Sequence, residues 1–193
     1  MKKIYLMLGL LALSTASFAQ EKVVENTKKL DYTISGGILA GMSGDLGLQF
    51  EAHGAHKTLF FDTKSNVSNI IRLDFSQITV SNGIMDVTGK GYVLSIGTRT
   101  YLSKNKETSK GLYTQNFFTG GTIKFDNDAY QGDFQYFSFF SPEIGYKLKV
   151  GNFSIDPSFG WQWNIEIKGR GDVDNRTFDN TFFKGALKLG YSF

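Results

Sequence analysis

The chain has 193 residues, enough for one domain with a full core, and neither a linker nor a composition shift marks a second domain. Charged residues make up 20% and aromatic residues 15%, with 22 glycines against 2 prolines, which argues against disorder or a helical bundle and favours strands joined by turns. The absence of cysteine excludes disulfides and thiolate chemistry, and a formal net charge of +3 does not indicate a nucleic-acid partner.

Residues 1–19 have the features of a secretory signal. Lys2 and Lys3 form a charged start, an apolar run of 10 residues follows at 4–13, and Ser17 and Ala19 are the small residues of a cleavage site before Gln20. The apolar run is too short for a spanning helix, which needs about 20 residues. We therefore expect cleavage near Ala19, a periplasmic lead-in at residues 20–29 and one domain at residues 30–193.

From Leu30 onward, strand-like runs alternate with clusters of Gly, Asn, Asp and Ser, and no segment longer than a turn or two has a helical period. The third run has the poorest alternation, and we expect a bulge or break in it near residues 65–69. The pattern predicts eight antiparallel strands, at about 30–40, 45–53, within 58–80, and at 91–102, 112–125, 136–149, 153–168 and 183–193.

The run at 153–168 alternates most clearly. One face carries bulky apolar side chains that include Phe159, Trp161 and Trp163, and the other carries polar or small residues such as Asp156 and Gln162. Soluble strands average five or six residues, whereas a tilted membrane strand needs about 9 to 11 and can continue above the bilayer. The length favours an all-β fold, a single antiparallel up-and-down transmembrane barrel.

The polar face is expected to line the lumen. Small residues interleaved with long polar ones suit the tight interior of a small barrel, whereas aromatic residues suit lipid and its interfaces. A basic residue facing lipid at the midplane costs about 2–4 kcal/mol, but inside the barrel opposite charges can pair. The expected lumen charge network comprises Glu51, Arg72, Asp74, Arg99, Lys124, Glu143, Lys147, Asp156, Glu166, Lys184 and Lys188.

A soluble barrel, with its apolar face inward as in lipocalins, is the rival fold. In the membrane interpretation, a last strand that ends in the periplasm puts the connections at 103–111 and 150–152 on the periplasmic side. The connections at 82–90, 126–133 and 169–180 then lie outside the cell, and the longest of them is external, as is usual for such barrels.

The chain resembles the small OmpA-like and OmpX-like outer-membrane barrels, and is most similar to the outer membrane protein β-barrel domain proteins common in Bacteroidetes. The resemblance rests on the signal peptide, the run Gly91 to Leu102 and the alternating last strand from Lys184 to Phe193. Tyr191 and Phe193 resemble the terminal signal that the barrel-assembly machinery reads, although Lys188 stands where glycine is frequent. The resemblance implies location and fold, and no substrate.

Candidate metal sites are weak. His53 and His56, near Glu51, fall in an expected turn and lack a fourth ligand, so we interpret them as polar turn residues. The pairs Asp126 with Asp128 and Asp172 with Asp174 have a D-x-D spacing but lack the glycine and the twelfth-position Glu of an EF-hand. These acids are better interpreted as solvated loop residues.

Other motifs give no enzyme site. Arg170-Gly171-Asp172 spells an integrin-recognition tripeptide, but three residues recur easily by chance, and a Gly-rich loop is the simpler interpretation. A lipid deacylase barrel would need a Ser-His pair on a lipid-facing strand end, and both histidines fall in the expected periplasmic turn. We expect no enzyme and no cofactor.

The sequence favours an outer-membrane barrel with a structural or surface-interaction role, whose external loops around Asn82, Asp126 and Asp172 form the contacting surface. Expected partners are outer-membrane lipids, the barrel-assembly machinery and an extracellular ligand, and the expected state is a monomer. Two alternatives stay open, namely an enzyme acting on membrane lipids and a narrow solute pore.

The signal assignment makes a direct prediction. Because residues 1–19 should be removed on export, the mature protein should begin at Gln20 and fractionate with the outer membrane. Mass spectrometry of the N-terminal peptide in separated membrane fractions checks both points. Recovery as a soluble periplasmic protein would revive the lipocalin-like interpretation.

Overall fold

The computed structural model describes residues 30–41, 44–54, 66–81, 86–102, 109–128, 130–173 and 180–193. The expected signal peptide and the lead-in at residues 20–29 lie outside these ranges. Within them, no helix is long and apolar enough to cross a membrane.

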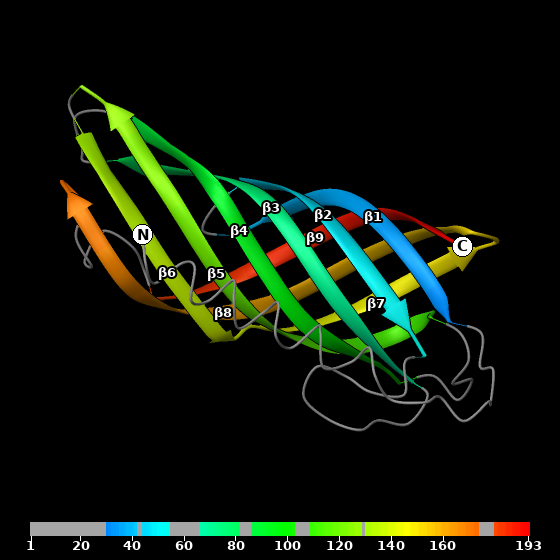
Figure 1. Ribbon diagram of the computed structural model, residues 1–193. Helices are drawn as coiled ribbons and strands as arrows, with labels where there is room; N and C mark the ends of the chain where they lie inside the picture. Colours follow the sequence, from blue (N-terminus) through cyan, green and yellow to red (C-terminus); the bar gives the residue numbers. More distant parts are fainter. Residues whose placement is uncertain are drawn as a thin grey trace, which may run out of the picture.

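The described chain forms one antiparallel sheet that closes on itself (Figure 1). β6 and β7 both lie between β5 and β8, so the two segments share one position and the ring has eight. The all-β, eight-stranded barrel expected from the sequence is therefore confirmed. The strands are β1 (Asp31–Ala40), β2 (Gly44–His53), β3 (Val67–Ser81), β4 (Asp86–Tyr101), β5 (Gly111–Asn127), β6 (Tyr130–Phe140), β7 (Pro142–Val150), β8 (Phe153–Gly171) and β9 (Thr181–Ser192).

The pairing of β1 with β9 closes the ring, and these two strands lie side by side in Figure 1. Beyond the ladder, the amide of Phe193 donates to the carbonyl of Tyr32 at 2.9 Å, and the amide of Tyr32 donates to the carbonyl of Phe193 at 3.3 Å. The two rings stack with centroids 6.0 Å apart. We call the end that holds Asp31 and Phe193 the terminal end, and the opposite one the far end.

The main break in the ladder lies at Ser141, between β6 and β7, and the break that the sequence suggested near residues 65–69 is absent from the described part of that range, 66–69. β3 pairs without interruption on both of its sides, with β4 from Val67 to Ser81 and with β2 from Ser68 to Gln77. Asn116 of β5 bridges the break, because its Oδ1 accepts from the Ser141 amide at 2.9 Å and its Nδ2 donates to the Phe139 carbonyl at 3.4 Å. The outward-facing amide thus satisfies backbone groups that the interrupted ladder leaves without strand partners.

The strands at the far end are longer than the sequence suggested. β4 begins at Asp86, β6 at Tyr130, and β8 continues to Gly171, so much of the expected external loops, Asp126 included, is strand. Most of the stretch between β2 and β3, at the terminal end, and most of the stretch between β8 and β9, at the far end, lie outside the described residues, so the expectation that the longest loop is external stays a prediction.

The reason is an inversion of polarity along the strands. Near the far end the outward residues become polar, as with Thr79 and Thr88, whose hydroxyls lie 3.0 Å apart. The inward residues become apolar and fully packed. They form the far-end apolar cluster, Ile78, Val87, Val93, Ile123, Phe125, Phe134, Tyr136 and Val173.

The barrel wall is accordingly uneven in height. β1 and β2 have 10 residues each, whereas β4, β5 and β8 have 16, 17 and 19. Figure 1 shows β4, β5 and β6 rising past β1 and β2 at the far end. The taller wall has the apolar-in, polar-out pattern of a sheet in water.

The seam between β1 and β9 can be tested at Phe193. Deleting Phe193 removes two backbone hydrogen bonds and the ring stack on Tyr32, whereas Phe193→Ala removes only the ring. Since a net hydrogen bond contributes about 1 kcal/mol, the deletion should lower the urea midpoint of the detergent-refolded barrel more than the substitution. Equal midpoints for the two variants would show that the terminal pairing does not stabilise the seam.

Candidate functional site

The barrel interior contains most of the charged residues that the sequence placed there. Nine of the expected lumen residues are buried, each with at most 7% of its surface exposed, namely Glu51, Arg72, Asp74, Arg99, Glu143, Lys147, Asp156, Lys184 and Lys188. They come from β2, β3, β4, β7, β8 and β9, whose alternation turns every second side chain inward.

Arg99 is the centre of the cluster nearer the terminal end. Its Nη1 lies 3.1 Å from Glu51 Oε2, and its Nη2 lies 3.0 Å from Asp156 Oδ2. The guanidinium also lies over the Tyr113 ring, 3.7 Å from the centroid, and Tyr113 donates a hydrogen bond to Asp156. Five donors in a planar fork allow one arginine to hold two carboxylates and an aromatic face together.

Two lysines complete this cluster. Lys147 Nζ lies 3.0 Å from Glu51 Oε2, and Lys188 Nζ lies 3.7 Å from Asp156 Oδ2. Glu51 accepts two further hydrogen bonds, from the Tyr101 hydroxyl at 2.7 Å and from Ser68 at 2.8 Å. Each buried carboxylate therefore has several donors, which a buried charge needs to offset its desolvation.

A second cluster lies nearer the far end, around Arg72. This side chain contacts Asp74 at 3.1 Å and Glu143 at 3.3 Å, and Lys184 Nζ lies 2.6 Å from Glu143 Oε1. Gln115 joins the two clusters, because it accepts from Arg99 Nε at 2.8 Å and donates to Glu143 at 2.5 Å. The interior is thus one continuous network from strand to strand.

Two expected members lie elsewhere. Lys124 is exposed on the outer face, where its ion pair with Asp126, at 3.0 Å, raises the pKa of Lys124. It belongs to the part of β5 where polarity is inverted, so the polar face no longer points inward. Glu166 is half-buried beside Gly169, above the network, and Ile167 is the extra residue of a bulge that turns Lys168 outward.

Sequence reasoning missed Asp45. It lies on β2 two positions before Gly47, on the same face as Glu51, and that spacing could have revealed it. A Cβ on Gly47 would collide with Asp74 Oδ1, so the glycine makes room for the carboxylate of Asp74. With Asp45 included, five acids, Asp45, Glu51, Asp74, Glu143 and Asp156, face the five bases Arg72, Arg99, Lys147, Lys184 and Lys188.

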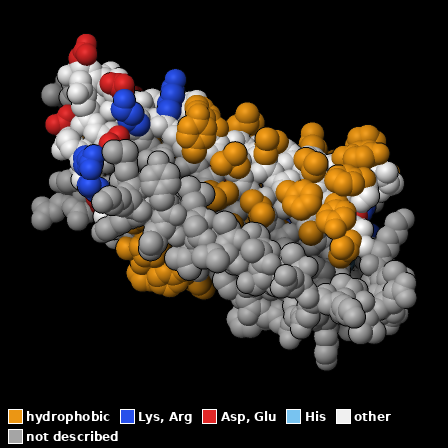
Figure 2. All heavy atoms as spheres, in the orientation of Figure 1, with side chains coloured by type: hydrophobic (Ala, Val, Ile, Leu, Met, Phe, Trp, Pro, Cys, Tyr) orange, Lys and Arg blue, Asp and Glu red, His pale blue; other side chains and the backbone are white. Residues whose placement is uncertain are grey.

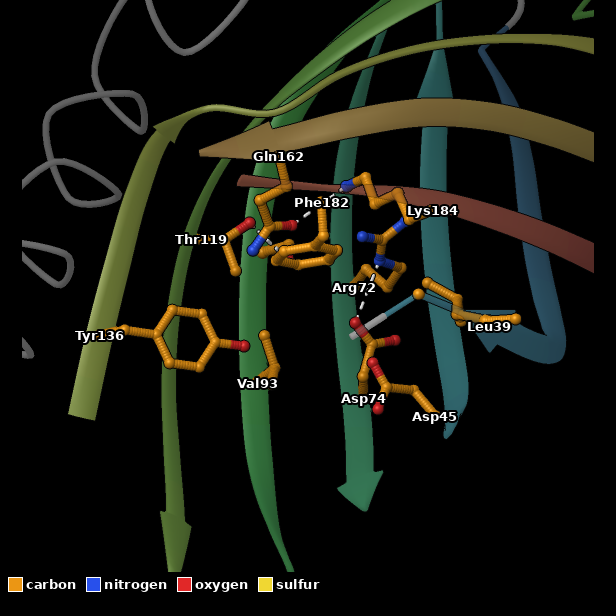
Figure 3. A pocket seen from close by; sticks show the side chains of 13 residues that line it. Leu39, Asp45, Arg72, Asp74, Val93, Thr119, Tyr136, Gln162, Phe182 and Lys184 are labelled. Carbon is orange, nitrogen blue, oxygen red and sulfur yellow. Dashed lines mark hydrogen bonds and ion pairs between the residues drawn. The ribbon is translucent and has the colours of Figure 1, made fainter. Parts of the chain in front are cut away.

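A small cavity of about 20 Å³ lies at the far-end mouth of the network. Figure 3 shows Asp45 and Asp74 beside Arg72 there, with Lys184 and Phe182 from β9 across the opening. Asp45 Oδ1 and Asp74 Oδ1 are buried and have no hydrogen-bond partner in the described part of the chain. The volume matches about one water molecule, the partner such oxygens need.

His53 lies at the end of β2 and faces the lumen, and is therefore not a turn residue. Its Nδ1 lies 2.9 Å from Ser68 Oγ, while Ser68 donates its proton to Glu51 Oε1. Ser68 Oγ must then accept from His53 Nδ1, the reverse of the proton transfer that activates a catalytic serine. Both side chains are at most 1% exposed, so this chain of hydrogen bonds has a structural role.

The remaining motifs are described only in part, since His56 and Asp174 lie outside the described residues. Asp126 and Asp128 are exposed, and within the described ranges no group of three or more potential metal-ligating His, Asp or Glu side chains occurs. Arg170 and Gly171 end β8, and Asp172 accepts from the Gln131 amide at 2.8 Å. The tripeptide at 170–172 is thus tied to β6.

The two residues of the expected assembly signal point outward at the terminal end. Tyr191 is 46% exposed and Phe193 61% exposed. The Tyr191 ring packs edge-on against Phe153, and its hydroxyl accepts from Asn152 at 3.2 Å. Both aromatic side chains therefore border the apolar outer surface.

Comparison with solved structures places the fold among outer-membrane barrels. The N-terminal β-barrel domain of Pseudomonas aeruginosa OprF matches with a TM-score of 0.56 and 15% identity, over 84% of this chain and 97% of that domain. A major outer membrane protein from Thermus thermophilus matches with a TM-score of 0.53 and 10% identity, over 86% of this chain and 100% of its own. At these identities the similarity shows the fold alone.

No protein-family model matches the chain, and neither does any curated protein. The resemblance to small outer-membrane barrels that the sequence indicated is confirmed at the level of fold.

The lumen network predicts a large asymmetry between buried and exposed ion pairs. Arg99→Met leaves Glu51 and Asp156 short of their shared cation, and should lower the free energy of unfolding by about 3–5 kcal/mol. Urea unfolding of the detergent-refolded protein measures it. The control Lys124→Met breaks a solvent-exposed pair and should change little; similar losses in both variants would mean a watery, unpaired lumen.

Proposed function

We propose that this chain is an integral outer-membrane protein that acts as a closed scaffold and presents its taller wall at the cell surface. The observation that carries the proposal is the outer surface. Around the whole ring the outward side chains form an apolar band, and Figure 2 shows its hydrophobic side chains on one face. The band includes Ile34, Ile38, Leu46, Leu48, Ile71, Leu73, Tyr92, Leu94, Phe118, Ile144, Leu148, Ile155, Phe159, Phe183, Leu187 and Leu189.

Water would be a poor solvent for this surface. Exposed apolar patches on soluble monomers rarely exceed a few hundred Å², whereas this band runs around every strand position, and no described outward residue within it is charged. At the height of the band, the charged side chains of the described residues instead lie inside the barrel. A soluble lipocalin-like barrel has the opposite arrangement, so a bilayer is the environment that the band fits.

The orientation follows from the ends of the barrel. Outer-membrane barrels carry their C-terminal strand end in the periplasm, and Tyr191 and Phe193 would there be accessible to the assembly machinery. The far end then faces the cell exterior, where the polar outer face of β3 to β6 and β8 would stand in water. If Phe193→Ala inserts less well in cells but refolds normally in vitro, the ring of Phe193 acts in recognition by the assembly machinery and not in the pairing of β1 with β9.

The lumen supports a scaffold better than a pore. An eight-stranded barrel leaves an interior only wide enough for side chains, and here ion pairs fill its middle while the far-end apolar cluster fills its upper part. The hydrogen-bond direction at Ser68 argues against hydrolase chemistry at the Ser-His pair. We therefore place the function on the outside of the barrel, at its lipid-facing and surface-exposed parts.

Membrane insertion and conductance test the proposal together. The wild type reconstituted in lipid vesicles should migrate as a compact, heat-modifiable species, and in a planar bilayer it should show no steady open channel. The control is a large porin in the same bilayer. A barrel that inserts and conducts would move the function to a pore, and a chain that stays soluble would remove the membrane assignment.

A further inference from the structure

At the far end, the exposed basic side chains lie closer to the apolar band than the exposed acidic side chains do. On the outer face of β4, Lys90 lies two residues from Tyr92, and on β8, Lys168 comes directly after Ile167. We name the four exposed bases nearest the band the basic belt, Lys90, Lys124, Lys168 and Arg170. The exposed acids lie farther out, toward the strand ends and turns, at Asp86, Asp126, Asp128 and Asp172.

Sheet register places the basic belt across four neighbouring strand positions. Lys90 of β4 pairs with Lys124 of β5, Lys124 pairs with Asp133 of β6, and Asp133 pairs with Arg170 of β8. Lys168 lies one level closer to the band, opposite Gln135. At about 4.8 Å between strands, the row spans about 15 Å, the width of a few lipid headgroups.

The sheet does not neutralise this belt on its own. Two lysines directly opposite each other, Lys90 and Lys124, destabilise a strand pair unless an anion lies between them. Asp133 is half-buried and lies between Lys124 and Arg170, and Asp126 pairs with Lys124, so two acids face four bases. Figure 2 shows Lys and Arg side chains at this end, next to the hydrophobic band, with acidic side chains toward the tip.

We propose that the basic belt binds the phosphate groups of anionic lipids in the leaflet at the far end. This rests on the proposed membrane location. Lysine and arginine donate charge-assisted hydrogen bonds to phosphate oxygens, and the apolar band immediately below gives the acyl chains of the same lipid a surface to contact. The acidic tip beyond the belt repels phosphate and so fixes the level at which the headgroups bind.

The two tryptophans of the chain provide a native reporter. Trp161 and Trp163 lie on β8, a few residues from Lys168, and Trp163 is 39% exposed on the outer face. Brominated acyl chains quench tryptophan on contact. The full mature protein is therefore reconstituted in mixed phosphatidylcholine and phosphatidylglycerol vesicles, with bromine on one lipid or on the other, and the ratio of quenching gives the lipid preference.

The wild type should show a several-fold preference for phosphatidylglycerol that falls in high salt. The variant Lys90→Gln, Lys168→Gln, Arg170→Gln should lose it, whereas the control Asp86→Asn, Asp126→Asn, Asp128→Asn, which changes as many charges at the tip, should keep it. Equal quenching by both lipids in an inserted wild type, or a preference that survives in the belt variant, overturns the inference.

Free phosphate is distinguished from lipid by a further arm. Inorganic phosphate and chloride are compared at equal ionic strength. Because the lipid also contacts the apolar band, the preference should be the same in both buffers. Loss of the preference in phosphate alone would show that the belt prefers free phosphate to the lipid headgroup, which also overturns the inference. Failure of the proposed function can be told apart from failure of this inference. If the proposed function is wrong, the wild type does not reach the compact, heat-modifiable form in any vesicle.

Discussion

Closure of the sheet between β1 and β9 is the constraint on which the rest of the structure depends. A closed ring leaves no unpaired edge, so the backbone can lie in lipid with its polar groups satisfied. Closure also turns every second residue into a confined lumen, where space and water are scarce. The identity of inward residues is then decided by volume and charge pairing, and that of outward residues by the surroundings at each height of the barrel.

The lumen shows what confinement demands. Arg99 and Arg72 each hold two carboxylates and lie over an aromatic ring, and Gln115 joins the two clusters. Buried ion pairs contribute little net stability relative to apolar packing, but removing one partner strands the other in a dry site. The network therefore selects one arrangement of the strands over others, while it adds little to the free energy of unfolding of that arrangement. The far-end apolar cluster does the opposite, because apolar packing stabilises without fixing hydrogen-bond partners.

Much of this arrangement was predictable from the two-residue period. It indicated eight strands and an inward set of which nine residues lie buried in the lumen. The prediction from this period failed in two places. At Lys124 the alternation continues, but above the apolar band the polar face points outward. At Ile167 an extra residue shifts the alternation, so that Lys168 also points outward. A sequence pattern shows which residues share a face, but not at which height lipid gives way to water or where a bulge occurs.

The same inversion links the fold to its proposed role. If the taller wall were lipid-facing along its full height, Lys90 and Lys168 would have to face hydrocarbon, at a cost that pairing could not offset. The apolar band ends at Tyr92 and Ile167, so in the proposed placement these two lysines reach the headgroup level. The strands above carry a polar outer surface on an apolar inner one. Because its own apolar side is packed inside the barrel, such a sheet keeps its shape without the bilayer and can present a fixed surface outside the membrane. The short strands β1 and β2 end lower, so the mouth of the lumen network lies beside the base of this taller wall.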